Sequence, residues 1–408
     1  MKLSRECIEE KLIQNKQYLS LSAAHGITYL SFSMLTFTEA WFVIDNLNMP
    51  NHLGFIMMAA TIPRLLLMLV GGVYADKKNR VSILYRSILS RVFLIFVLVG
   101  LIFSQYINWG SFLIIVLLVG ICDAFYWPAS SSILPSIVQK ENLTKANSVI
   151  QVLSQGSMIL GPVLAGILIE KQSIITSFLL SAGLLMIACL LLRGIKDTKT
   201  NNIKEEIGAS VLIREVLVYI KDSKLLTRLL IGTIFVNLVI VGPLFMGLPI
   251  YVKSVLNGNT IDYSLLESLL GVGTLIGAVL IGVINPGKHR GKIILFSLLL
   301  GAIFYGLLSI SVYMVTASIA IFLLGIMLAG AQIPLISAIQ SIVREDLLGR
   351  FMSIYNTASL GLVPVSYAVT SLLLTFNIEI QIIMAVGSAT LFLVVLSLFM
   401  NKQLRSFN

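Results

Sequence analysis

Four ionisable side chains lie inside long apolar stretches of this sequence, where they are placed to bind and release protons. Three are acids, Glu39, Asp123 and Glu267, and one is a base, Arg64. If the stretches are membrane spans, each charge costs roughly 2.5–3.5 kcal/mol or more unless it is paired or hydrated, so such residues usually mark functional sites. Burial raises the pKa of a carboxyl group and a nearby arginine lowers it. An acid whose surroundings change can therefore take up a proton and release it.

Arg64 follows Pro63 halfway along its apolar run, which is the most costly position of the four. We expect Arg64 to face a cavity or to form a cluster with Glu39, Asp123 or both. The alternative is a permanent ion pair that only holds helices together. Glu39 and Asp123 then qualify by location as proton-binding groups, and Glu267, nearer the outer edge of its run, is the weaker candidate.

The composition indicates which elements position these residues. The chain of 408 residues is 57% hydrophobic and 12% charged, with a mean hydropathy of +0.95, whereas a soluble domain is about 25% charged. Apolar runs of about 20 residues recur along it, long enough to cross a bilayer as helices and too long for barrel strands. The sequence predicts an all-α polytopic membrane protein with twelve transmembrane helices in two six-helix pseudo-repeats. The predicted helices are 18–44, 53–75, 82–104, 111–131, 146–169, 173–193, 226–252, 262–284, 292–312, 316–340, 351–375 and 379–400.

The even number of helices places both termini on one side of the membrane. About 25 of the 29 Lys and Arg residues fall in the termini and in alternate loops, which the positive-inside rule assigns to the cytoplasm. The outer loops hold only Lys171 and Lys253. The net charge of +10 therefore indicates topology rather than nucleic-acid binding. Arg91 is expected to extend to the inner headgroups, and the polar first 17 residues predict no cleavable signal peptide.

The longest loop divides the chain into an N-terminal bundle at 1–193, a cytoplasmic linker at 194–225 and a C-terminal bundle at 226–408. Apolar residues recur every three to four positions in Val211–Ile220, which predicts a short helix on the inner membrane surface. Similar segments occur at equivalent places in the two halves, such as Ser136-Ile137-Val138 and Ser341-Ile342-Val343. These matches indicate that the two halves are related, and the family that the chain resembles, named below, implies a substrate cavity between them near the middle of the membrane.

Two motifs could govern movement of the halves. The loop after the second helix reads Gly72-x-x-x-Asp76-Lys77-x-x-Arg80. Gly72 would let a neighbouring helix approach closely, and the charged residues would lock and release the halves, although an ordinary cationic loop is the alternative. The second motif lies in the fifth helix and consists of Gly156, Gly161, Pro162 and Gly166. Its glycines would let helices pack backbone to backbone, and its proline can bend the helix.

Several side chains are candidates for the wall of a substrate cavity. The aromatic ones would suit bulky amphipathic ligands, and the polar ones would offer hydrogen bonds, unless they only pack or bond between helices. The set is Tyr29, Phe32, Tyr126, Gln151, Gln155, Asn237 and Gln332.

The sequence carries no signature of an enzyme. The cysteines, Cys7, Cys122 and Cys189, show neither a disulfide framework nor metal-ligand spacing. Neither a nucleophile–base spacing nor a Gly-x4-Gly-Lys-Ser/Thr loop is present, which argues against catalysis and against direct use of ATP. We therefore expect no cofactor and no metal.

The loop at 72–80 resembles the signature loop of the major facilitator superfamily of secondary transporters. The fifth-helix motif resembles that of its drug and metabolite antiporters. The segments Phe125-Tyr126-Trp127-Pro128-Ala129, Leu143-x-x-Ala146-Asn147-Ser148 and Leu348-Gly349-Arg350-Phe351 resemble the bacterial macrolide-efflux branch, which includes siderophore exporters.

The resemblance implies a monomer in the bacterial cell membrane that exports hydrophobic or amphipathic small molecules by proton antiport. Its partners would be the substrate, protons and the lipid bilayer. The sequence departs from the family at one point. Many such antiporters carry an arginine early in the fourth helix, whereas the corresponding segment here, Ile115–Gly120, contains no basic residue. Alternatives are a dedicated exporter of an endogenous siderophore or peptide, uptake of a nutrient by the same fold, and a lipid flippase.

Overall fold

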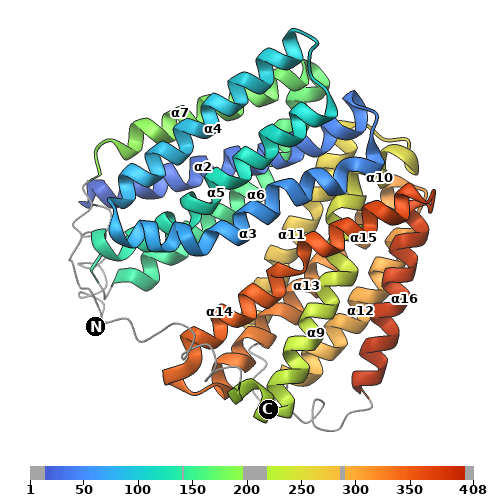
Figure 1. Ribbon diagram of the computed structural model, residues 1–408. Coiled ribbons are helices and arrows are strands. Elements are labelled where there is room, and N and C mark those ends of the chain that lie inside the picture. Colours follow the sequence, from blue (N-terminus) through green and yellow to red (C-terminus); the bar gives the residue numbers. More distant parts are fainter. Residues whose placement is uncertain (1–13, 140–141, 196–217, 285–289, 400–408) are drawn as a thin grey trace. The chain divides into compact units, whose positions relative to one another are not determined.

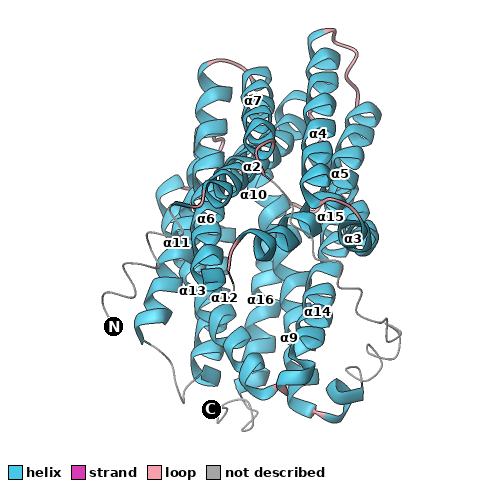
Figure 2. Ribbon diagram, turned by 90° about the vertical axis from the view of Figure 1, so that its left-hand side faces the viewer, coloured by secondary structure: helices cyan, strands magenta, loops and turns pink. Residues whose placement is uncertain are grey.

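Helices make up nearly all of the residues that the computed structural model describes, which are 14–139, 142–195, 218–284 and 290–399 (Figure 1). Figure 2 shows only helices and loops in this part of the chain. Eleven of the described helices are long and apolar enough to cross a membrane, and a shorter apolar helix follows at Ile380–Leu396. The chain is thus an all-α polytopic membrane protein.

The chain divides into two compact units, Met1–Asn201 and Asn202–Asn408, here called unit 1 and unit 2. The elements of unit 1 are α2 (Lys16–Trp41), η1 (Phe42–Asn46), η2 (Pro50–His52), α3 (Leu53–Lys77), α4 (Arg80–Phe103), α5 (Trp109–Ile137), α6 (Leu143–Lys171) and α7 (Ile174–Leu192). The elements of unit 2 are α9 (Lys224–Val241), η4 (Gly242–Met246), α10 (Gly247–Ser254), α11 (Thr260–Ile284), α12 (Arg290–Ile310), α13 (Met314–Ile342), α14 (Glu345–Gly361), α15 (Val363–Thr375) and α16 (Ile380–Phe399). Each predicted helix has a counterpart within a few residues.

Polar side chains at the loop ends specify where several helices begin. Asn15 accepts hydrogen bonds from the backbone N–H groups of the first turn of α2, and Asn79 accepts one at the start of α4. At α5, Asn108 and Ser111 form a reciprocal capping box. These caps satisfy N–H groups that have no partner within the helix.

The helices of the two units pair in the same way. In unit 1, α2 packs against α6 and α7, α3 against α5, and α4 against α5 and α7. In unit 2, the α9–η4–α10 rod packs against α15 and α16, α11 against α13, and α12 against α13 and α16. Counted from the start of each unit, these are the same five pairs. The shared pattern supports the predicted pseudo-repeat.

Glycines bring the second and fourth helices of each unit into close contact. In unit 1, a Cβ added at Gly71 would strike the backbone carbonyl of Ala124, and one at Gly120 would strike the backbone of α3. In unit 2, Gly273 and Gly325 play the same part between α11 and α13. Such contacts let helices associate backbone to backbone where apolar burial gives little net gain in lipid.

The first helical rod of each unit contains a π-helical turn. In unit 2 this turn begins at Gly242, where Ser366 of α15 inserts its hydroxyl into the helix. The hydroxyl accepts from the Gly242 N–H at 2.7 Å and donates to the Leu238 carbonyl at 2.6 Å. An unbroken α-helix would join those two backbone groups to each other. The side chain therefore satisfies the groups that the π turn separates.

The predicted surface helix at 211–220 lies mostly outside the described residues. Its described end begins a short helix at 218–222. There Ile220 is buried with Leu347 and Phe351 of α14, and the Tyr219 hydroxyl donates to the Ile342 carbonyl at 3.4 Å. This end of the segment therefore packs against α13 and α14 within unit 2.

Candidate functional site

A buried ion pair between α4 and α5 is the main charged feature in the described part of unit 1. The guanidinium of Arg91 pairs with the carboxylate of Asp123, and the side chains are only 1% and 6% exposed. The prediction that Arg91 extends to the headgroups is therefore wrong. Arg91 is thus a partner of Asp123 that the prediction did not include, and the predicted cluster of Arg64 with Glu39, Asp123 or both stays a prediction. Pairing spares both groups the cost of an isolated charge in a membrane.

Tyr126 lies beside this pair. It follows Asp123 by one helical turn, and its ring centroid is 5.4 Å from the guanidinium carbon of Arg91. This geometry is a cation–π contact, and burial strengthens such contacts. Tyr126 is itself buried, with an exposed fraction of 2%. The arginine is thus held by a carboxylate and an aromatic face from the same helix.

Glu39 of α2 and Arg64 of α3 complete the charged group. Both are half-buried. Glu39 attracts the charge of Arg91 and Arg64 repels it, so both lie within electrostatic range of the ion pair. We call Glu39, Arg64, Arg91 and Asp123 the charged cluster. Its two acids balance its two bases.

A histidine extends this polar region along α2. His25 is 4% exposed, and its Nδ1 lies 3.1 Å from the hydroxyl of Ser130. Its ring is edge-on to that of Tyr126 at 6.4 Å. Tyr126 therefore contacts both Arg91 of the charged cluster and His25.

Three aromatic residues predicted for the cavity lie around Trp127 of α5. The Trp127 ring centroid is 5.0 Å from that of Tyr29, 5.8 Å from that of Phe32 and 5.4 Å from that of Tyr126. Tyr29 and Phe32 come from α2, whereas Tyr126 and Trp127 are neighbours on α5. The aromatic side chains therefore form one cluster between these helices, and sequence spacing alone did not give Trp127 its central place.

The four polar residues predicted for the cavity have different surroundings. On α6, Gln151 is exposed and Gln155 is half-buried. On α9, the Asn237 amide donates to the Ser359 carbonyl at 3.0 Å, which is the interhelical role named as the alternative. Gln332 on α13 is exposed. Their contact with a substrate stays a prediction.

The fifth-helix motif serves packing at Gly161. A Cβ there would fall against Ser33 of α2, whereas one at Gly156 would meet nothing within 4 Å in the described structure. Pro162 and Gly166 are buried in α6. Gly161 therefore allows α6 to approach α2 closely.

The predicted gating loop lies between α3, which ends at Lys77, and α4, which begins at Arg80. A Cβ at Gly72 would meet no described atom within 4 Å, whereas one at Gly71 would meet α5, so the predicted close approach at Gly72 stays a prediction. The side chains of Asp76 and Lys77 lie outside the described part of the structure. Their role as a latch stays a prediction.

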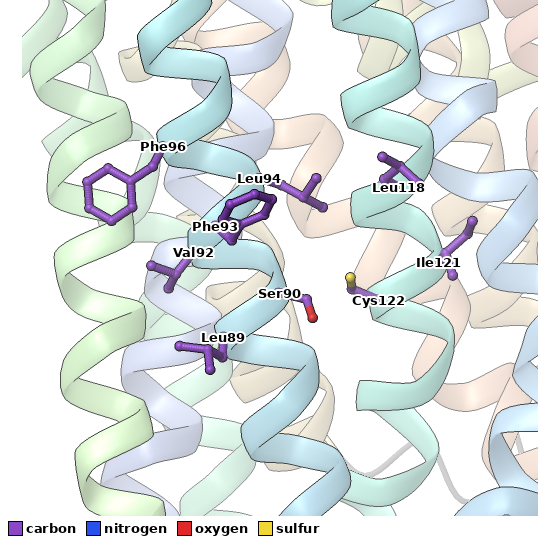
Figure 3. Close-up of a pocket in the computed structure, with 9 residues that line it drawn as sticks. All are labelled: Leu89, Ser90, Val92, Phe93, Leu94, Phe96, Leu118, Ile121 and Cys122. Atoms are coloured by element: carbon purple, nitrogen blue, oxygen red, sulfur yellow. The ribbon is translucent and has the colours of Figure 1, made fainter.

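An apolar pocket of about 650 Å³ lies between α4 and α5, one residue away from the ion pair along each helix (Figure 3). Its lining residues are Leu89, Ser90, Val92, Phe93, Leu94, Phe96, Leu118, Ile121 and Cys122. Only Ser90 and Cys122 bring polar atoms, so the lining suits hydrocarbon. None of the side chains predicted for the substrate cavity lines it.

Glu267 lies apart from these groups, on α11 of unit 2. Its carboxyl group accepts a hydrogen bond from the hydroxyl of Tyr263, one turn earlier on the same helix. Its Oε2 is shielded from solvent and has no hydrogen-bond partner in the described structure. Among the described residues, no group of three or more His, Cys, Asp or Glu side chains is placed to hold a metal ion.

The fold and the intramembrane charges agree with the comparisons with known proteins. The model of the Major Facilitator Superfamily matches residues 21–366, so the chain belongs to this family of transporters and is not an enzyme.

Two bacterial relatives match this chain over most of its length. Macrolide efflux protein A of Streptococcus pyogenes is 22% identical over 376 residues, covering 87% of this chain and 89% of the relative. The staphyloferrin A transporter of Staphylococcus aureus is 23% identical over 381 residues, covering 90% and 91%.

Solved structures share the fold. The nucleoside transporter NupG superposes with a TM-score of 0.77 at 10% identity, covering 95% of this chain and all of that chain (100%). A D-xylose–proton symporter superposes with a TM-score of 0.72 at 14% identity, covering 94% and 97%.

Proposed function

We propose that this protein exports hydrophobic or amphipathic small molecules, of the macrolide type or a related metabolite, by proton antiport. The observation that carries the proposal is the similarity to macrolide efflux protein A over most of both chains. The aromatic cluster around Trp127 supports it, because aromatic walls suit bulky amphipathic ligands.

Buried ionisable groups support the proton as the driving ion. The charged cluster and Glu267 lie in membrane-spanning helices, where ionisable residues are expensive and commonly serve ion or proton pathways. In this mechanism units 1 and 2 rock about a cavity near mid-membrane, which opens alternately to each side. Asp76, Lys77 and Arg80 would close the cytoplasmic side. Both termini would then be cytoplasmic, in the membrane of a bacterial cell, and the protein would work as a monomer.

Expression in a bacterium that lacks its own efflux pumps tests the direction and the class of substrate. Cells with the protein should tolerate higher concentrations of macrolides or other amphipathic compounds than cells with an empty vector. They should also accumulate less of the labelled compound. Equal sensitivity across a broad panel, with the protein present in the membrane, would contradict export of toxic compounds.

A second candidate is a dedicated exporter of an endogenous siderophore. The observation that favours it is the near-full-length similarity to the staphyloferrin A transporter. Deleting the gene for this protein in its source organism distinguishes siderophore export from drug efflux. Loss of a secreted iron-binding metabolite, with unchanged drug sensitivity, would support the siderophore, and the reverse result would support drug efflux.

A further inference from the structure

The two units of this protein place the carboxyl groups of their membrane-spanning helices in different environments. In unit 1, Asp123 is paired with Arg91, and the charged cluster as a whole balances two acids with two bases. A balanced cluster loses its electrostatic match when one acid takes up a proton. Removing the charge from one member of a buried ion pair leaves the other uncompensated, which is strongly unfavourable.

Glu267 has a different environment. The helices that pack most broadly against α11 are α13 and α10. The sequence of α13 contains no Asp, Glu, Lys, Arg or His, and α10 contains only Lys253, which is exposed near its end. The other acid of α11 is Asp262, which accepts a hydrogen bond from the Asn259 backbone at the helix start. Packing thus leaves Glu267 without a buried basic neighbour on these helices.

The polar groups near Glu267 are tyrosines. Tyr263 is 3% exposed and donates to the Glu267 carboxyl group, and Tyr367 of α15 interacts electrostatically with Tyr263. α15 has no ionisable residue other than this tyrosine. A phenol can donate to a carboxylate and accept from a carboxylic acid, so both forms of Glu267 have a partner.

We propose that Glu267, rather than an acid of the charged cluster, binds the coupling proton, with Tyr263 as the positioning residue. The inference rests on the proposed proton antiport. The carboxylate takes a proton from water on one side of the membrane, which forms an O–H bond at one carboxyl oxygen. The neutral acid avoids the cost of an unpaired charge in an apolar environment. When the opposite side opens to Glu267, water removes the proton and the carboxylate returns.

Proteoliposomes with wild-type protein and Glu267→Gln test this assignment with a radiolabelled macrolide as the first probe. Two rates are measured: exchange of labelled for unlabelled compound without a pH gradient, and accumulation driven by a pH gradient. The variant mimics the protonated acid, so exchange should stay within about twofold of wild type while gradient-driven accumulation falls at least tenfold. Compound-induced proton movement should fall to the same extent. Glu379→Gln, which alters an exposed acid of the same unit, should leave both rates unchanged.

The outcomes separate the two proposals. Wild-type exchange that no pH gradient accelerates would contradict the proposed proton antiport itself. A wild-type protein that is driven by the gradient, together with an equally driven Glu267→Gln variant, would overturn only the assignment of Glu267. If Glu267→Gln also loses exchange, Tyr263→Phe decides: a shifted pH midpoint of exchange supports the assignment, and an unchanged midpoint overturns it.

Discussion

Arg91 and Asp123 hold each other inside unit 1, and their surroundings explain why neither can be changed alone. The pair is almost fully buried, with Tyr126 against the arginine. A lone charge left there would have no compensating partner, whereas two apolar side chains would pack without that cost. The ion pair is therefore evidence that α4 packs against α5 in one specific arrangement. It is weak evidence for a gain in net stability.

We expect Arg91→Met or Asp123→Leu alone to lower the free energy of unfolding by about 3–5 kcal/mol. The double variant should recover most of the loss, because it removes both charges together. Thermal unfolding of the purified protein in detergent measures this. Arg86→Met, an exposed arginine on the same helix, is the control and should change stability little. Additive losses in the double variant would show that the two residues are not energetically coupled.

Most charged residues of the candidate site were predicted from the sequence, but the place of Arg91 in it was not, and neither was its pairing with Asp123. Asp123, Glu39, Arg64 and Glu267 stand out because charge is rare in apolar runs. Which base meets which acid depends on how each helix is rotated and how far it is shifted along the membrane normal. Arg91 looked near enough to a helix end to leave the membrane core, whereas packing of α4 on α5 turns it inward.

At the scale of elements, neighbouring glycines on α3 differ in what they contact. Gly71 lies against the backbone of α5, whereas Gly72 meets nothing within 4 Å in the described structure. Gly71→Ala should therefore destabilise the protein by about 1–3 kcal/mol, as overpacking does. Gly72→Ala should be neutral or slightly stabilising, since alanine favours helix. Unfolding in a denaturant series compares them, and equal effects would contradict a close contact of α3 with α5 at Gly71.

The π turn in the first rod of unit 2 depends on a single hydroxyl. Ser366→Ala would leave the N–H of Gly242 and the carbonyl of Leu238 without that partner. We expect a loss of about 1–3 kcal/mol, the cost of leaving a buried polar group unsatisfied. Thr375→Val is the control, because that hydroxyl bonds the carbonyl one turn earlier on its own helix. If the two variants unfold at the same temperature, Ser366 does not stabilise the turn.

The element boundaries came mostly from hydropathy and were predictable to within a few residues. Hydropathy does not show interruptions inside a long helix. The break between α14 and α15 comes at Leu362, just before Pro364, and the π turn of unit 2 falls within a continuous apolar run. These features depend on contacts between helices, such as that of Ser366, which no local pattern encodes.

At the scale of the whole molecule, the same set of helix pairs recurs in both units. The all-α membrane fold followed from composition and hydropathy, whereas the predicted linker at 194–225 lies mostly outside the described residues. The proposed latch at Asp76 belongs to this scale, because its effect would be on the movement of one unit against the other.

Asp76→Asn should abolish transport while leaving membrane insertion and thermal stability intact. The physical reason is that the neutral amide cannot pair electrostatically with cationic side chains when the cytoplasmic side closes. Uptake into inverted vesicles measures transport, and the amount of folded protein in the membrane is the reference. Lys78→Gln, which changes an exposed charge of the same loop, should retain most activity. Normal transport by Asp76→Asn would remove the latch from the mechanism.

Proton movement that depends on the exported compound is the most direct measurement of proton-coupled export. Proteoliposomes containing the protein and an internal pH indicator would be given a macrolide, and then each class of amphipathic compound in turn, with empty liposomes as the control. We predict that at least one class moves protons in the opposite direction to itself and that an imposed pH gradient drives its accumulation. Compound flux through the protein that moves no protons and is unaffected by the gradient would contradict proton-coupled export.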